Sequence, residues 1–363
     1  MIRALVNGQL FEQAISISVH RSIRNLVGWF DLASSAAAGD VLPIKCGDRI
    51  ELLSEGRNRL LTGFVEELSI TQGADDHEIR IAGRDLAADL VDSTLKVKTY
   101  NGPISLEDLV KRVISDQGLS LSVINEAGNL AKLKEADLVA GEIGQSAFAF
   151  LEQYARHVQA VLTCNGKGEV VILRAGPRAG SFSLLRQADN PATNILSSSL
   201  TLNQSGRFRD YVCRSQLSPA SKKFDLLSKD VANQSGTATD PEARAGRFFE
   251  FDHDVSGDSL TCGDRAKLEA NVRRASSLDY SATVQGIPEG LEINRQIAVL
   301  DDLCRINSIL LVTELEHQFD LEGGTTTTIR LTYKDAFTLE ESVAAADASR
   351  EETGESLLTL GGS

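Results

Sequence analysis

The sequence predicts an α+β protein that is predominantly β, with a β region at each end of the chain and mixed α+β regions between them. Residues 1–82 consist of short alternating apolar runs separated by glycines, which is typical of a small barrel or sandwich. Helical spacing of apolar residues appears only later, as in residues 105–118. Near the C-terminus, residues 329–331 (Ile-Arg-Leu) repeat the order of residue types in residues 79–81 (Ile-Arg-Ile).

Residues 79–92 join the first β region to the mixed region that follows it. Alternation of isoleucine with arginine at residues 79–81 predicts a half-buried strand. Gly83 is expected to form a turn after that strand, because glycine adopts backbone angles that other residues resist. Asp85 is then expected to cap a short helix whose apolar face holds Leu90.

A similar pair of strands precedes each copy of this pattern. Residues 47–53 lead to residues 60–68 in the first copy, and residues 295–300 lead to residues 309–315 in the second. Matches of this length also arise by chance among β sequences, so the residues alone leave duplication as a hypothesis. If it is real, the chain carries one β domain at each end.

The middle of the chain changes character. Ser105 and Ser146 each precede a helical pattern as N-caps, and residues 165–168 (Asn-Gly-Lys-Gly) predict a hairpin turn. Thr261 is expected to begin a further helix that runs to about Ser277. The predicted domains are a first barrel at 1–95, an α+β domain at 96–178, a second barrel at 179–216 and 283–340, an inserted α+β domain at 217–282, and a mobile acidic tail at 341–363.

Composition limits the classes of function. The 363 residues suggest two or three domains, and 51 acidic against 37 basic residues give a net charge of −14. That excess argues against a protein that grips nucleic acid by its phosphates. The five scattered cysteines favour free thiols in a reducing compartment, and no apolar run approaches the length of a membrane span. We therefore expect a soluble protein made in a cytoplasm.

No catalytic, cofactor-binding or metal-binding residue is proposed from the sequence. Phosphate-loop and nucleophile-elbow motifs are absent, and the five histidines lie far apart. The best local cluster, residues 252–254 (Asp-His-Asp), is interpreted as a solvated loop. The acidic pairs Asp301-Asp302 and Glu66-Glu67 are interpreted as turn and surface charge, since adjacent strand residues point to opposite faces.

The order and spacing of several motifs resemble the baseplate hub (tail protein P) family of Mu-like contractile-tailed phages. The resemblance covers most of residues 1–340, and the acidic tail after Glu340 lies outside it. Its motifs are residues 79–92, residues 194–196 followed by 207–213, the arginine-bearing stretch 265–275, residues 294–302 followed by 310–313, and residues 323–337.

The resemblance implies a structural protein rather than an enzyme, and no cofactor. It implies a homotrimeric hub, with two related barrel domains per chain, that joins a six-fold tail tube to a three-fold spike and leaves a channel for DNA. The implied partners are the spike protein, the tail tube and tape measure proteins, and other baseplate proteins. DNA would pass without specific binding, and the chain would not insert into a membrane. The implied location is the virion baseplate, after assembly in the bacterial host cytoplasm.

Two other classes of function stay open. A tail-associated cell-wall hydrolase would need a catalytic glutamate among residues 100–180, and peptidoglycan zymography would reveal it. A glycan-binding β module would be expected to expose aromatic side chains, of which the chain has few, with one Trp and five Tyr. The candidate glutamates are Glu107, Glu126, Glu135, Glu142 and Glu152.

Overall fold

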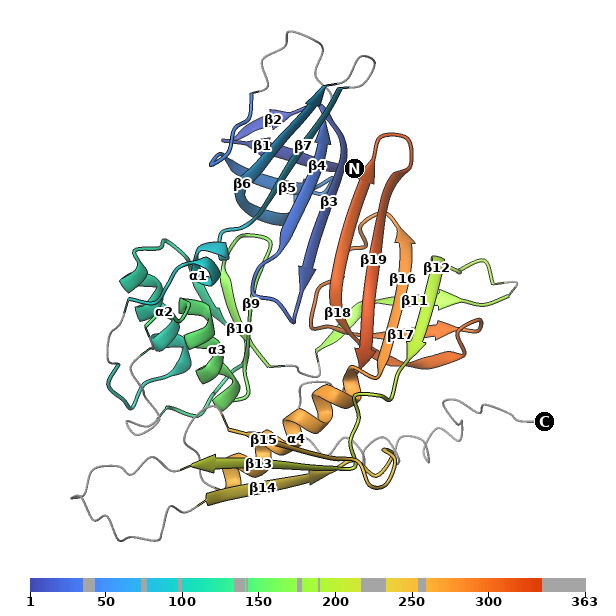
Figure 1. Cartoon of the computed structure of the whole chain (residues 1–363). Coiled ribbons are helices and arrows are strands. Elements are labelled where there is room, and N and C mark those ends of the chain that lie inside the picture. The colour runs from blue at the N-terminus through green and yellow to red at the C-terminus, as the bar shows by residue number, and fades with distance from the viewer. Residues whose placement is uncertain are drawn as a thin grey trace.

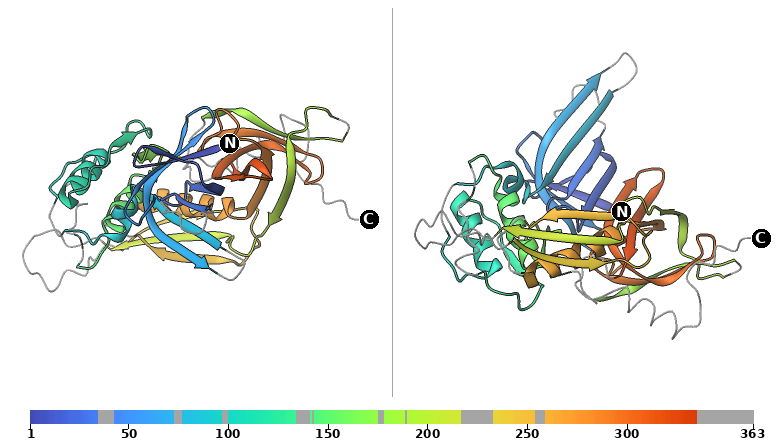
Figure 2. Two further views of the ribbon diagram at one scale, coloured as in Figure 1. Left: turned by 90° about the horizontal axis from the view of Figure 1, so that it is seen from above. Right: turned by 60° about the horizontal axis from the view of Figure 1, so that its bottom comes forward.

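The computed structural model describes residues 1–34, 43–72, 77–96, 100–133, 141, 143–174, 178–188, 190–216, 233–253 and 259–334. One 13-stranded sheet forms the body of this part of the chain, and two three-stranded sheets and four helices lie beside it (Figures 1 and 2). The prediction of a predominantly β protein is confirmed. No helix within the described ranges has the length and hydropathy needed to cross a membrane. The predicted tail at 341–363 lies outside the described residues.

The first seven strands form what we call the first unit. Each strand pairs antiparallel with its neighbours in the order β3-β4-β7-β6-β5-β1-β2. Inward-facing side chains such as Phe30, Leu32 and Leu52 form its own hydrophobic core. The strands are β1 (Ile2–Val6), β2 (Gln9–Phe11), β3 (Ala14–Ser22), β4 (Trp29–Ser34), β5 (Arg49–Ser54), β6 (Arg59–Gln72) and β7 (His77–Asp85).

Six later strands form the second unit, in the order β12-β16-β19-β18-β17-β11. A separate core fills this unit, with Tyr280, Val312 and Leu331 among its fully buried members. The strands are β11 (Ala179–Arg186), β12 (Ile195–Leu202), β16 (Leu278–Gln285), β17 (Gln296–Asp301), β18 (Ile306–Asp320) and β19 (Gly324–Tyr333).

The two units share one strand plan. The order β3-β4-β7-β6-β5-β1 corresponds to β12-β16-β19-β18-β17-β11, although β1 runs antiparallel to β5 whereas β11 runs parallel to β17. Register shifts also fall at corresponding places. The pairing shifts between Val65 and Glu67 in β6 and between Val312 and Glu314 in β18. A second pair of shifts lies early in β3 and early in β12. β-bulges are specific local features, so their recurrence is strong evidence of duplication.

Backbone hydrogen bonds repeat as well. The N–H of Gly47 donates to the carbonyl of Val65 at 2.8 Å, and the N–H of Asn294 donates to that of Val312 at 2.9 Å. Both donors have positive φ, 89° at Gly47 and 62° at Asn294. Glycine and asparagine are the residues that adopt this conformation most readily.

The structure corrects the alignment of the two copies. In the paired strands, Ile329 lies opposite Leu315, which occupies the place that Leu68 holds opposite Ile81. Ile329 therefore corresponds to Ile81, not to Ile79 as the residue order suggested. The short motif matched by alternation alone, and alternation is preserved when a strand is displaced by two residues.

The turn predicted at Gly83 is also wrong, because Gly83 lies inside β7. A Cβ atom there would lie 2.0 Å from the carbonyl oxygen of Phe64 and 2.8 Å from the ring of Phe30. Glycine is needed for the close approach of neighbouring strands and not for a turn.

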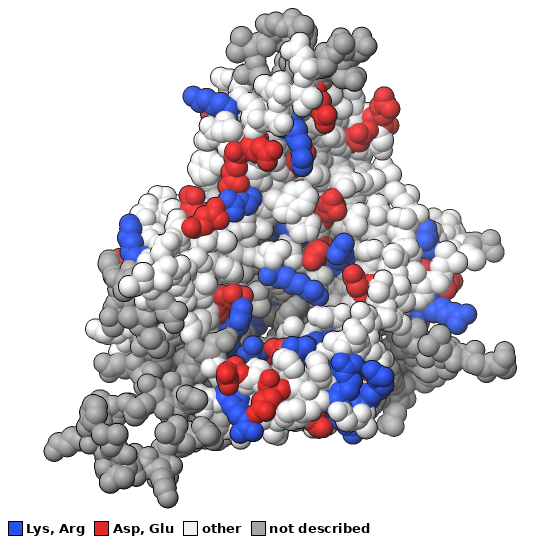
Figure 3. Space-filling view, viewed as in Figure 1, with Lys and Arg blue, Asp and Glu red and all other residues white. Residues whose placement is uncertain are grey.

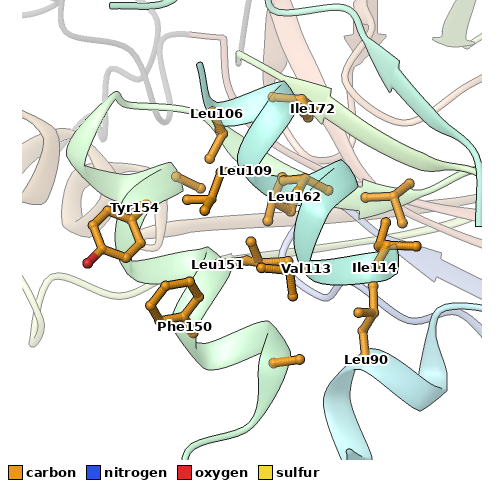
Figure 4. Packing of buried hydrophobic residues seen from close by; sticks show 14 of the residues in the cluster. Leu90, Leu106, Leu109, Val113, Ile114, Phe150, Leu151, Tyr154, Leu162 and Ile172 are labelled. Atoms are coloured by element: carbon orange, nitrogen blue, oxygen red, sulfur yellow. The ribbon is translucent and has the colours of Figure 1, made fainter. Parts of the chain in front are cut away.

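Residues 88–173 form the α+β region that follows the first unit. Ser105 and Ser146 accept backbone N–H bonds as the N-caps of α2 and α3, as predicted. Leu109, Val113 and Leu151 meet between these helices (Figure 4). The elements are α1 (Ala88–Asp92), α2 (Leu106–Gln117), β8 (Val123–Asn125), α3 (Ala147–His157), β9 (Val161–Cys164) and β10 (Val170–Leu173). β9 and β10 flank the predicted hairpin turn.

An inserted region lies between β12 and β16. It contains β13 (Asp210–Gln216), β14 (Asn233–Thr239), β15 (Phe248–Asp252) and α4 (Ser259–Ala275). The assignment of residues 209–216 to the second barrel was wrong, because β13 pairs with β14 and β15. Residues 278–282 were placed in the insert but belong to β16 in the large sheet. Alternation predicts a strand but does not say which strand lies beside it.

One local prediction in the insert also needs correction. α4 begins at Ser259, two residues before the predicted start at Thr261. Upstream of it, the chain forms a turn after Asp240, whose carboxylate accepts the backbone N–H of Glu242. That carboxylate also forms a buried two-point ion pair with Arg207, with N–O distances of 2.8 Å. Asp240 therefore holds the turn through its side chain.

Candidate functional site

The two units are joined edge to edge by a pair of strands far apart in the sequence. Residues 314–320 of β18 pair antiparallel with residues 16–22 of β3, and β18 and β3 lie next to each other in Figure 1. His317 lies opposite Val19 and Phe319 opposite Ile17, and all four side chains are buried. We call this pairing the internal junction.

Charged and polar groups complete one end of the internal junction. The Glu314 carboxylate lies 3.6 Å from the ring of His20 and 3.6 Å from the guanidinium of Arg330. The hydrogen bond from His20 and the nearby Arg330 charge lower the pKa of Glu314, against the opposing effect of its partial burial. The carboxylate thus stays ionised and links β3, β18 and β19.

A buried histidine lies at the centre of the internal junction. The Oγ1 hydroxyl of Thr327 donates to the carbonyl of Gly286 at 2.6 Å, so Nδ1 of His317 acts as the donor to that hydroxyl at 2.9 Å. Burial, with a smaller contribution from the Arg21 charge, lowers the pKa of His317 to about 4. The imidazole is therefore neutral at pH 7.

The contact between the first unit and the α+β region is formed by Arg21 and Asp85. Arg21 donates to the carbonyl of Cys164 at 3.0 Å. Asp85 accepts backbone N–H bonds from Gly28 at 2.6 Å and from Ala87 at 3.0 Å. Ala87, not Asp85, is the N-cap of α1, so the predicted role of Asp85 was wrong. Burial raises the pKa of Asp85 to about 6 despite these hydrogen bonds.

Residues from the motif at 79–92 form an ion-pair cluster on the outside of the first unit. The Arg84 guanidinium lies 2.7 Å from the Glu66 carboxylate and 2.5 Å from that of Asp92. Hydrogen bonds from Arg84 lower the pKa of Asp92, so this charge cluster ties β6, β7 and α1 together. The Glu66 half of the Glu66-Glu67 pair thus serves as a surface ion-pair partner.

Three of the five glutamates considered for a hydrolase lie in the described part of the chain, and each pairs with a basic side chain. Glu107 pairs with Lys111, Glu126 with Arg178 and Glu152 with Arg156. The hydrogen bond from Lys111 lowers the pKa of Glu107, which is opposite to the raised pKa that a general acid needs. The other two, Glu135 and Glu142, lie outside the described residues.

The remaining polar candidates are structural where the structure describes them. Asp301 is buried and accepts the Tyr280 hydroxyl at 2.8 Å and the backbone N–H of Cys304 at 3.1 Å. His253 packs edge-on against His157. No group of three or more potential metal ligands occurs in the part of the chain that the structure describes.

The surface carries both signs of charge. On the face shown in Figure 3, Lys and Arg side chains alternate with Asp and Glu side chains. Among the exposed large apolar residues are Ile70 on β6 and Leu202 on β12, at the edges of the two units. Neither these edges nor the internal junction was identified from the sequence. The apolar residues at alternating positions in these strands could have indicated edges that pair with another strand.

Two family models match the N-terminal half of the chain. Residues 1–85 match the model described as Mu phage baseplate assembly protein GpP-like, N-terminal. Residues 87–174 match the model described as baseplate hub protein gp44-like, second domain. The boundary between them falls just after β7, where the first unit ends.

Similar proteins extend the match beyond these two domains. The chain is 24% identical over 289 residues to the baseplate hub protein gp44 of Escherichia phage Mu, which covers 77% of this chain and 72% of that protein. The 43 kDa tail protein of prophage MuSo2 from Shewanella oneidensis has the same fold, with a TM-score of 0.78 and 21% identity over 92% of this chain and 98% of that one.

A more distant structure shares the architecture. The Escherichia coli c3393 protein is described as a type VI secretion component similar to the T4 phage tail proteins gp27 and gp5. It has a TM-score of 0.58 and 10% identity over 90% of this chain and 76% of that chain. Residues 1–85 and 87–174 are thus baseplate hub domains of the Mu-like type, and most of the chain is similar to phage tail hub proteins.

Proposed function

We propose that three copies of the chain close into a ring that joins the six-fold tail tube to the three-fold spike. The observation that carries this proposal is the duplicated strand plan, with bulges and hydrogen bonds at corresponding positions. Three chains with two similar units each present six similar units to a six-fold partner. The opposite face of such a ring is free to present three-fold features. A closed cyclic assembly also requires each chain to use two complementary surfaces.

The proposed division of the chain follows the strand pairing. Residues 1–85 form the first tube domain, and residues 179–202 with 278–334 form the second. The α+β region at 88–173 and the insert at 203–277 lie outside the ring plan and are available for other baseplate proteins. The proposed partners are the spike, tail tube and tape measure proteins, and the ring leaves a channel through which DNA passes unbound.

The electrostatic part of the proposal concerns the channel wall. The chain has a net charge of −14, and like charges on a wall repel DNA phosphates. We therefore expect Asp and Glu, rather than Lys and Arg, to dominate the surface that faces the channel. A structure of the assembled ring with a channel lined by basic side chains would contradict this expectation.

The mass of the purified protein tests the ring. Size-exclusion chromatography with light scattering at several concentrations should give three times the 39.1 kDa mass of the chain. A monomer that persists at the highest concentration would remove the support for a ring that forms from this chain alone.

A further inference from the structure

The duplication indicates what the free edges of the sheet bind. Each position of the internal junction has a counterpart at a free edge, because the two units share one register. Residues 314–319 of β18 correspond to residues 67–72 of β6. Residues 16–22 of β3 correspond to residues 197–203, which are the later part of β12 and the residue that follows it. The chain therefore carries one free edge that corresponds to the β18 side of the internal junction and another that corresponds to its β3 side.

Both counterparts lack a partner strand among the described residues. From Glu67 onward β6 pairs only with β7, and β12 pairs only with β16. Ile70 is 56% exposed on β6 and Leu202 is 46% exposed on β12. At the internal junction, His317 occupies the position of Ile70 and is buried, and Arg21 occupies that of Leu202 and is half-buried. The two free edges thus expose apolar side chains where the internal junction buries or half-buries its own.

The free edges also lack the usual protection of edge strands. Proteins normally place charged residues or proline on exposed edges to prevent pairing with another chain. Residues 68–72 read Leu-Ser-Ile-Thr-Gln, and residues 195–202 read Ile-Leu-Ser-Ser-Ser-Leu-Thr-Leu. Neither stretch contains a charge or a proline, so both are suited to pair with a strand.

We propose that the end of β6 in one copy pairs antiparallel with β12 of a second copy, in the register of the internal junction. This inference rests on the proposed ring and specifies how its subunits join. The internal register transfers to Leu68 opposite Leu202, Ser69 opposite Thr201 and Ile70 opposite Leu200. Opposite residues of an antiparallel pair point to the same face. The two leucine-containing pairs therefore bury the exposed apolar side chains on one face.

Three such contacts alternate with three internal junctions around the ring. Each unit then contacts its neighbours through the same kind of strand pair, whether the neighbour belongs to the same chain or to the next. This arrangement produces a near six-fold ring of strands from three chains. No free β6 or β12 edge remains in it.

A disulfide between subunits tests the register. Ser69 and Thr201 are exposed and predicted to lie opposite each other, at a Cα separation of roughly 4.5–5.5 Å, which a disulfide can span. The variant S69C/T201C should form a covalent trimer under mild oxidation in a background with the exposed Cys46 changed to serine. The control S69C/S197C displaces one thiol by about 13 Å along the strand and should stay uncrosslinked. The single variants S69C and T201C should also stay uncrosslinked, which excludes linkage through the native thiols.

The outcomes separate this inference from the ring itself. A trimer by light scattering without a specific S69C/T201C crosslink would overturn the strand pairing and leave the ring standing. A chain that is monomeric at every concentration and never crosslinks would overturn both. Equal crosslinking of S69C/T201C and S69C/S197C would overturn the proposed register.

A charge at the edge provides a second measurement that does not depend on disulfide geometry. Ile70→Lys places an ammonium in the proposed contact, and because Ile70 is exposed the fold of the single chain should tolerate it. We expect the concentration needed for half-assembly to rise at least about tenfold. The matched control Ile143→Lys changes a residue that is 96% exposed in the α+β region and should assemble as the unmodified chain does. Unchanged assembly of Ile70→Lys would overturn the proposal.

Discussion

The two units of the chain use the same backbone plan and fill it with different side chains. Where the first unit has Phe30 packed over Gly83, the second has Tyr280 packed beside Leu331. The hydroxyl of Tyr280 reaches Asp301 in β17. The bulges and the positive-φ positions fall at corresponding places in the two units. The sizes of the core side chains at corresponding positions differ. The two units therefore share their strand register but not the details of their side-chain packing.

This difference explains why the duplication is difficult to see in the sequence. In the first unit two strands approach so closely that a Cβ on Gly63 would lie 1.9 Å from the carbonyl oxygen of Arg84. The corresponding position in the second unit is the buried Leu310. Side-chain size at matched positions is therefore a poor guide to common origin here. We expect that placing a residue of one unit at the corresponding position of the other lowers the unfolding free energy.

The largest expected effect comes from giving the first unit a side chain at Gly83. Gly83→Ala places a methyl group 2.0 Å from the carbonyl oxygen of Phe64, and a backbone atom cannot move aside as a flexible side chain can. We expect a loss of at least about 3 kcal/mol in unfolding free energy, or no soluble protein, because the strand must shift. Denaturant unfolding measures this loss.

The control for that change is Gly206→Ala. A Cβ at Gly206 has no atom within 4 Å, and the backbone there is not in the left-handed region. Its unfolding free energy should stay within about 0.5 kcal/mol of the unmodified chain. Equal stability of Gly83→Ala and Gly206→Ala would show that close strand approach does not distinguish the first unit.

A second prediction tests the pH dependence of stability that the buried His317 gives to the internal junction. His317 has a folded pKa of about 4, below the unfolded value of 6.5, so the unfolded chain binds the proton more readily between these values. The stability it contributes is present above pH 6.5 and is lost as the pH falls towards 4. The full change is about 3 kcal/mol for this residue.

The measurement is the difference in unfolding free energy between the unmodified chain and His317→Gln from pH 7 to pH 4. The difference is needed because Asp85, with a folded pKa of about 6 against 3.8, acts in the opposite direction. Asp85 stabilises the fold below pH 3.8 and loses that contribution as the pH rises through 6, equally in both proteins. Parallel pH curves for the two proteins would rule out a buried neutral His317.

Local structure was predictable from the sequence where neighbouring residues decide it. The helix caps at Ser105 and Ser146 and the hairpin after Cys164 depend on hydrogen bonds within a few residues, and each was predicted correctly. The pairing of residues 209–216 was not, because any alternating strand exposes the same backbone groups to several possible neighbours. Sheet membership there is decided by the contact of β13 with β14, β15 and α4.

The candidate site shows the same limit. The motif at 79–92 correctly marked the end of the first unit, and its Arg84 forms an ion pair with Asp92 that was not predicted. The internal junction pairs Glu314 with Ser22, which are far apart in the sequence. No local sequence feature of either strand identifies the other as its partner. The two-residue error at Ile329 has the same origin, because alternation within one strand is unchanged when the strand is displaced by two residues.

The smallest expected effect concerns the hydroxyl that distinguishes the second unit. Tyr280→Phe copies the residue that the first unit has at Phe30 and removes one donor from the buried carboxylate of Asp301. Burial alone would raise the pKa of Asp301, but hydrogen bonds from Ser198, the Cys304 backbone and Tyr280 outweigh it and lower that pKa. Losing one of them should cost about 1–3 kcal/mol in unfolding free energy at pH 7.

The reciprocal change provides the matched comparison. Phe30→Tyr adds a hydroxyl in the first unit, which has no counterpart of Asp301. Because Leu52 in β5 corresponds to Val299 in β17, the position of Asp301 is occupied by Ser54. If each unit depends on its own packing, both exchanges destabilise. The cost of Tyr280→Phe is largest near neutral pH, where Asp301 is ionised, and shrinks as the pH falls and Asp301 takes up a proton. Should Tyr280→Phe leave stability unchanged between pH 4 and 8, the Tyr280–Asp301 hydrogen bond would contribute nothing to the second unit, and the two cores would be interchangeable at this position.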